Sequence, residues 1–186
     1  MKALAVLPIV ALLLTSCVSE YFTVNEGTPG VLYGKIMSNI DSVEVVRQTT
    51  LKVYSGGVAA LRNYDVTQCR WELHSTLTKG TQTIYRVRTL PIEKRLIPSI
   101  DIIYSTSGCR VEEEGRLLVS NDTVRAVPGV AEKIQVTNDG DYLTVMIGCT
   151  RVYREPVKRP STEWLVVESP SGSEVVVTNI STEETR

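Results

Sequence analysis

The 186-residue sequence contains little histidine, few aromatic side chains and no excess of charge of either sign. Its single histidine, His74, is the only base available to a histidine-dependent catalytic triad. Twenty Lys and Arg residues against 21 Asp and Glu residues give a formal net charge of −1, which argues against nucleic acid as a partner. Charged residues at 22% and apolar residues at 42% are typical of a globular domain and not of a disordered chain.

Long hydrophobic runs are missing too, with one exception at the start of the chain. Residues 3–14 form an apolar run of 12 residues that is interrupted only by Pro8. A helix that crosses a membrane needs about 20 apolar residues, so this run is too short to span a bilayer. A short run behind the single charge of Lys2 is typical of an export signal that is cleaved.

The residues at the end of this run, Leu14-Thr15-Ser16-Cys17, place an aliphatic residue and two small residues directly before a cysteine. This stretch resembles the lipobox of bacterial lipoproteins. The resemblance covers only the first 17 residues, and it implies that cleavage follows Ser16 and that Cys17 becomes lipidated. Two or more acyl chains on one residue suffice for stable anchoring in a membrane. By the same resemblance, Val18 in place of Asp after the cysteine implies the outer membrane, and we expect the domain to face the periplasm.

The chain therefore divides into four predicted segments: a signal peptide at 1–16, a lipidated tether at 17–28, a single β domain at 29–180 and a polar tail at 181–186. Cleavage removes 16 residues and leaves 170, which is enough for one domain with a sizeable hydrophobic core.

The pattern of the predicted domain is β almost throughout. Short segments rich in Val, Ile, Thr and Tyr alternate with clusters of Gly, Pro, Asn and Asp. After a first strand at 31–37, about ten short strands are predicted at 43–54, 66–77, 82–90, 99–105, 109–119, 123–127, 131–137, 142–153, 163–169 and 173–180. This series predicts an all-β fold, an antiparallel β-sandwich, with a small β-barrel as the alternative. Residues 58–64 contain helix formers and are left open as helix, strand or turn.

Alternation predicts the two faces of the strand at 66–77. Buried side chains are expected at Cys69, Trp71, Leu73, Ser75 and Leu77, and solvent-facing ones at Arg70, Glu72, His74 and Thr76. Asn138-Asp139-Gly140-Asp141 predicts a tight hairpin turn, because Asx and Gly residues tolerate left-handed backbone conformations. The Val-rich segments 164–167 and 174–178 are predicted to pair as a closing hairpin.

Three cysteines remain after Cys17, and an odd number permits at most one disulfide. Cys109 and Cys149 follow a glycine in similar local sequences, so we expect this pair if a disulfide forms. The alternative is that all three are buried thiols, which behave as small hydrophobic side chains. No Cys-x-x-Cys motif is present, and we expect neither a metal site nor a cofactor.

No catalytic constellation stands out, so we expect a protein that is not an enzyme. His74 falls on the polar face of its predicted strand, and Ser107-Gly108-Cys109 has no nearby base. The acidic run Glu112-Glu113-Glu114 cannot direct all three carboxylates to one side of a strand.

The segment 90–98 is the most plausible contact site in the sequence. It is bracketed by prolines, and it combines apolar and basic residues, namely Pro91, Ile92, Lys94, Arg95 and Ile97. We interpret it as a partner-docking loop, because loops carry function more often than frameworks do. Alternatively it folds back so that Ile92 and Ile97 complete the core.

Anchor, tether and β domain together favour a non-enzymatic accessory or structural subunit of an envelope assembly. Its expected partners are the membrane, through the lipid on Cys17, and other envelope proteins. The alternative is a lipoprotein that binds a ligand, whether a glycan, a lipid or a small molecule. Trp71 and Trp164 could supply its aromatic contacts, although the face of Trp71 predicts a core position.

Overall fold

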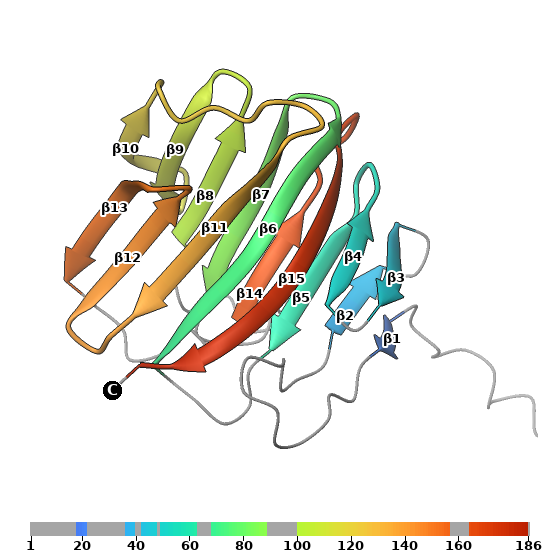
Figure 1. Cartoon of the computed structure of the whole chain (residues 1–186), viewed down its shortest axis with the longest axis horizontal. Helices are drawn as coiled ribbons and strands as arrows, with labels where there is room; N and C mark the ends of the chain where they lie inside the picture. Colours follow the sequence, from blue (N-terminus) through green and yellow to red (C-terminus); the bar gives the residue numbers. More distant parts are fainter. Residues whose placement is uncertain are drawn as a thin grey trace, which may run out of the picture.

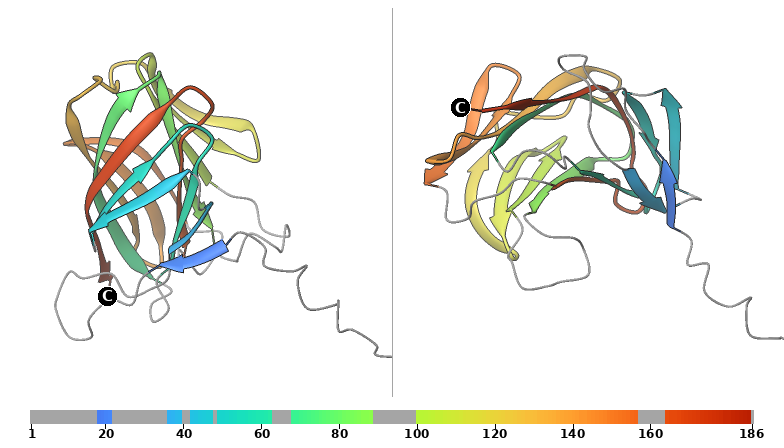
Figure 2. Two further views of the ribbon diagram at one scale, coloured as in Figure 1. Left: turned by 90° about the vertical axis from the view of Figure 1, so that its right-hand side faces the viewer. Right: turned by 90° about the horizontal axis from the view of Figure 1, so that it is seen from below.

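The computed structural model describes residues 18–21, 36–39, 42–47, 49–62, 68–88, 100–156 and 164–185. These residues form fifteen β-strands and no helix, and the strands make two antiparallel sheets that face each other (Figures 1 and 2). The two sheets are not closed into a barrel within the described part of the chain. The prediction of an all-β antiparallel sandwich is therefore confirmed.

Sheet A has eight strands. In spatial order they are β1 (Val18–Tyr21), β2 (Ile36–Asn39), β5 (Val58–Arg62), β14 (Trp164–Glu168), β7 (Gln82–Arg88), β8 (Ile100–Ser105), β9 (Gly108–Glu113) and β10 (Arg116–Asn121).

Sheet B has seven strands and faces the viewer in Figure 1. In spatial order they are β13 (Thr150–Pro156), β12 (Tyr142–Ile147), β11 (Ala131–Asn138), β6 (Cys69–Lys79), β15 (Glu174–Glu184), β4 (Thr50–Val53) and β3 (Val43–Arg47).

The core lies between the inward faces of the two sheets. The alternation predicted for β6 is confirmed, because its buried side chains are Cys69, Trp71, Leu73, Ser75 and Leu77. Sheet A contributes Tyr85, Ile102 and Leu165 from three neighbouring strands, each at most 1% exposed. Burying a large apolar side chain of this kind stabilises the fold by about 1.5–3 kcal/mol. The core therefore fixes the orientation of both sheets and of the side chains on their outward faces.

Several predicted strands are in fact two strands joined by a tight turn. The segment 109–119 is divided by Glu114 and Gly115, which both have positive φ angles and join β9 to β10. The segments 43–54 and 142–153 are likewise β-hairpins. Continuous β-favouring sequence concealed these turns, because Glu114, unlike Gly115, is not a residue that marks a position with positive φ in a sequence. Residues 123–127 are not a strand, and 58–64 contains β5.

The predicted closing hairpin is wrong. β14 pairs with β5 and β7 in sheet A, whereas β15 pairs with β4 and β6 in sheet B. Both segments are rich in valine, so their composition does not reveal the sheet to which each belongs. β15 also continues to Glu184, so most of the predicted polar tail is part of a strand.

Two of the four predicted segments lie largely outside the described residues. The signal peptide and Cys17 are not described, nor are residues 22–28 of the predicted tether. Residues 18–21 of that tether form β1, which pairs with β2 at the edge of sheet A.

Candidate functional site

The outward face of sheet A carries charged side chains at its centre, on three neighbouring strands. Arg86 of β7 lies opposite Asp101 of β8 and Val166 of β14 in the strand register. Arg86 Nε donates a hydrogen bond to Asp101 Oδ2 at 3.1 Å, and Arg86 Nη1 donates one to Glu168 Oε2 of β14. We call Arg86, Asp101 and Glu168 the Arg86 cluster.

The three side chains of the Arg86 cluster are largely withdrawn from solvent. They are 20%, 21% and 23% exposed, in the order Arg86, Asp101 and Glu168. Burial alone would lower the pKa of the Arg86 guanidinium, but its hydrogen bond to Glu168 and the charge of Asp101 outweigh burial and raise that pKa. A partly buried charge is costly unless it is paired, so the cation and the two carboxylates fix one another in place.

The polar face continues onto β9. Glu112 lies opposite Asp101 in the register, and Arg110 Nη1 lies 3.7 Å from Glu112 Oε1. Two residues along the strands from Arg86 and Asp101, on the same face, Ile84 lies opposite Ile103, and both side chains are partly exposed. The outward face of sheet A therefore combines paired charges of both signs with aliphatic surface.

Such an arrangement suits a ligand with several hydroxyl groups. Arg86 offers N–H donors, the two carboxylates offer oxygen acceptors, and a hydroxyl group can act as either donor or acceptor. Binding sites typically contain a few fixed polar groups set among apolar ones. Among its described side chains this face has no aromatic residue, so stacking would have to come from elsewhere.

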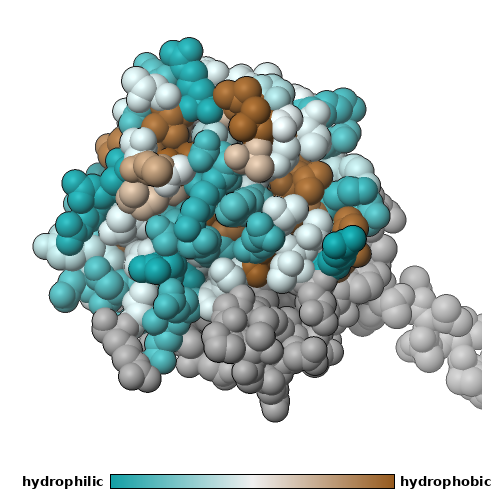
Figure 3. Space-filling view, viewed as in Figure 1, coloured by the Kyte–Doolittle hydropathy of each residue, from teal (hydrophilic) through white to brown (hydrophobic). Residues whose placement is uncertain are grey.

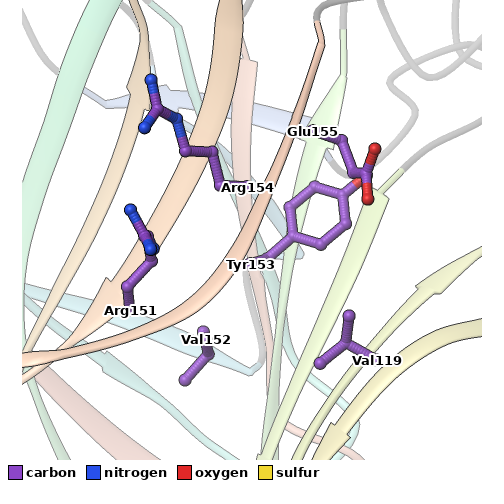
Figure 4. A pocket seen from close by; sticks show the side chains of 6 residues that line it. All are labelled: Val119, Arg151, Val152, Tyr153, Arg154 and Glu155. Atoms are coloured by element: carbon purple, nitrogen blue, oxygen red, sulfur yellow. The ribbon is translucent and has the colours of Figure 1, made fainter.

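A pocket of about 320 Å³ lies beside β13, where the edge strands β10 and β13 come close together. It is lined by Val119 of β10 and by five consecutive residues of β13, from Arg151 to Glu155. Figure 4 shows Tyr153 on the same side of β13 as Val119, with the Arg151 and Arg154 guanidinium groups on the other side of the strand. Burial raises the pKa of Tyr153, so its hydroxyl stays protonated.

The site residues predicted from the sequence are mostly not described by the structure. Cys17 lies outside the described residues. The predicted docking loop lies outside them as well, with all its named members, Pro91, Ile92, Lys94, Arg95 and Ile97.

The predicted disulfide is not formed, since Cys109 and Cys149 are both free thiols. Cys109 is 1% exposed on the inward face of β9 in sheet A, whereas Cys149 is exposed in the turn between β12 and β13 of sheet B. The similar local sequences reflect similar turns, because Gly108 and Gly148 both have positive φ angles. Burial raises the pKa of the Cys109 thiol to about 12, as expected of an unreactive core thiol.

His74 lies on the outward face of sheet B, opposite Lys133 and Thr178. Figure 3 shows that hydrophilic groups predominate over the middle of this face. Trp71 is 1% exposed and belongs to the core, as its face predicted. The side chain of Trp164 lies outside the described residues.

The Arg86 cluster was missed by sequence reasoning. Its members were each inside predicted strands, but Asp101 and Glu168 are 15 and 82 positions away from Arg86. Alternation alone predicts that Arg86 points away from its buried neighbours Tyr85 and Val87. Only the strand order, which the sequence does not provide, brings the three side chains together.

Two further features are absent from the described residues. These residues contain no group of three or more His, Cys, Asp or Glu side chains placed to hold a metal ion. They also contain no helix of the length and hydrophobicity required to cross a membrane.

The sequence matches no protein-family model and no curated protein. Solved structures do match the fold. A candidate glycosyl hydrolase from Parabacteroides distasonis is similar at a TM-score of 0.59 and 13% identity, over 78% of this chain and 91% of that one. Carbohydrate binding module CBM66 from Bacillus subtilis is similar at a TM-score of 0.55 and 10% identity, over 72% and 86%. The exoplasmic/lumenal domain of VIP36, in its Ca²⁺/Man3GlcNAc-bound form, is similar at a TM-score of 0.55 and 7% identity, over 81% of this chain and 84% of that one. At these identities the likeness shows the fold alone.

Proposed function

We propose that this protein is a carbohydrate-binding lipoprotein that holds glycans on the outward face of sheet A. The observation that carries the proposal is the Arg86 cluster, a fixed set of donors and acceptors at the centre of the sheet. The fold is shared with a carbohydrate binding module and with a glycan-bound lumenal domain, which supports the same ligand class. Lipidation at Cys17 would hold this domain at the membrane surface.

Binding without cleavage is the form of the proposal that the geometry favours. Glycoside hydrolysis commonly uses two carboxyl groups, one as an acid and the other as a base or nucleophile, on either side of the scissile bond. Asp101 and Glu168 instead both accept a hydrogen bond from the same guanidinium group. Their carboxyl groups are therefore turned toward Arg86 and not toward a glycosidic bond placed between them. Structural similarity to a candidate glycosyl hydrolase does not alter this assignment, since the likeness extends only to the fold.

The ligand hypothesis is preferred here over a subunit of an envelope assembly. The strand register and the hydrogen bonds define a polar face suited to hydroxyl groups, whereas no observation on the described residues points to a protein partner. The assembly hypothesis stays a prediction, and so does the location at the outer membrane.

A glycan-binding assay on the full-length protein in detergent micelles tests the proposal. We expect binding to one or a few neutral polysaccharides, and a loss of at least tenfold in affinity for Arg86→Gln. Arg86→Lys keeps the charge but loses the planar guanidinium group, so its affinity should lie between those of the native protein and of Arg86→Gln. Arg116→Gln is the matched control. It removes the same charge from an arginine that is also paired with a carboxylate, Glu113, but in the edge hairpin of sheet A and not at its centre.

The folding of each variant is checked by its far-ultraviolet spectrum and unfolding midpoint. The proposal fails if no neutral glycan binds, or if Arg86→Lys is folded and binds as well as the native protein. Release of reducing ends from a bound glycan would contradict binding without cleavage.

A further inference from the structure

A second polar surface lies on the hairpin of β12 and β13, at the edge of sheet B (Figure 1). Its register places Thr144 opposite Arg154 and Met146 opposite Arg151, with a β-bulge between these two pairs. Because of the bulge, two successive residues, Val152 and Tyr153, are both buried. Bulges commonly redirect side chains in this way.

The bulge brings two arginines to the same side of β13. Arg151 and Arg154 are both exposed, and Figure 4 shows their guanidinium groups on the side opposite Tyr153. Arg154 also lies over the ring of Tyr142, with its Cζ 4.1 Å from the ring centroid. This cation–π contact holds one guanidinium in a defined position.

Neither arginine has a carboxylate oxygen within 4 Å among the described residues. By contrast, Arg70, Arg86, Arg110 and Arg116 each form an ion pair. Asp139 is close enough for Arg154 to help lower its pKa, but its Oδ1 accepts hydrogen bonds from the backbone amides of Asp141 and Tyr142.

Two like charges on the same side of one strand repel each other, and an anion placed between them relieves that repulsion. Guanidinium groups bind carboxylate, sulfate and phosphate groups through two parallel hydrogen bonds. Attraction to a lipid surface commonly uses four to eight clustered basic residues, which a single pair does not provide. The arginine pair beside a tyrosine and a threonine therefore suits one oxyanion carried by a polar molecule.

We propose that the outward face of the β12–β13 hairpin binds an acidic glycan. In this site Arg151 and Arg154 donate hydrogen bonds to a carboxylate or sulfate group, and the Thr144 hydroxyl and Tyr142 ring contact the sugar that carries it. The site is separate from the Arg86 cluster, which lies on the other sheet. It would give the protein a second, charge-selective mode of glycan capture.

The test measures binding of the full-length protein in micelles to polygalacturonate, to chondroitin sulfate and to neutral dextran. We expect both acidic polymers to bind, and Arg151→Gln/Arg154→Gln to lose at least tenfold in affinity. The matched control is Lys52→Gln/Lys79→Gln, which removes the same charge from two other exposed positions of sheet B. It should change the affinity less than threefold.

Three results would overturn the inference. The acidic polymers do not bind, the two double variants lose affinity equally, or glycerol 3-phosphate competes better than galacturonate or sulfate. The last result would assign the arginine pair to a phospholipid headgroup. Binding of neutral glycans through Arg86 is measured separately, so failure here leaves the first proposal standing.

Discussion

The hydroxyl of Tyr85, in β7 of sheet A, donates a hydrogen bond to the hydroxyl of Ser75, in β6 of sheet B. Both residues are at most 2% exposed. The bond therefore crosses the hydrophobic core and joins the two sheets directly. Burial of the Tyr85 ring raises the pKa of its hydroxyl, so the donor keeps its proton.

Removing either end of this bond should destabilise the protein. Tyr85→Phe leaves the Ser75 hydroxyl without its partner, and Ser75→Ala does the same to Tyr85, at a cost of about 1–3 kcal/mol each. The double variant should cost less than the sum of the two, because no unpaired hydroxyl remains. Urea unfolding measures all three, and Tyr54→Phe on the surface should cost less than about 0.5 kcal/mol. Strict additivity of the two single changes would contradict the bond.

Gly80 and Gly115 allow backbone strain to be separated from steric exclusion. Both have φ near +80°, but a Cβ on Gly80 would lie 2.5 Å from the carbonyl oxygen of Gly172, whereas one on Gly115 meets nothing within 4 Å. Gly115→Ala should cost about 1–2 kcal/mol through its φ angle alone. Gly80→Ala should cost about 1–3 kcal/mol more, since the β6–β7 turn must move away from Ser173. Equal losses in thermal unfolding would show that the close contact relaxes freely.

The cysteines should differ sharply in reactivity. At pH 8, iodoacetamide should modify Cys149 within minutes and leave Cys109 unmodified until denaturant is added, because Cys109 is 1% exposed. Peptide mass spectrometry locates the adducts. A Cys109–Cys149 peptide found without reduction would show the disulfide that the structure does not contain, and equal modification of both residues would contradict the burial of Cys109.

Stability should fall at alkaline pH. The thiol of Cys109 has a pKa of about 12 in the folded protein against a usual 9.0, so its contribution is complete below about pH 9. That contribution is lost as the pH rises from about 9 toward 12, by at most about 1.4 kcal/mol per pH unit. Burial raises the pKa of Tyr104 to about 12 and acts in the same direction. Urea unfolding at pH 8, 9.5 and 10.5 should show the decline, with a shallower slope in Cys109→Ala.

Local features of this fold could be predicted from the sequence, and long-range ones could not. The alternation of β6 and the turn at Asn138 were predictable, because each depends on neighbouring residues; Asn138 Oδ1 accepts from the Gly140 amide at 2.9 Å. The sheet to which β14 and β15 each belong could not be predicted, because a strand with valines on both faces can pack in either sheet. The Arg86 cluster could not be predicted for the same reason, because its three side chains meet only when β14, β7 and β8 lie side by side.

The position of β15 bears on when this protein can fold. It follows every other described strand in the sequence, yet it lies inside sheet B between β6 and β4, and it pairs with residues about a hundred positions earlier. Until β15 arrives, one edge of β6 has no strand to pair with, so sheet B cannot form strand by strand in the order of the sequence. Folds with such distant pairings assemble slowly. A chain in this condition keeps one half of sheet B unpaired from the other until nearly all of its length is available, and the fold closes only when its last described strand arrives.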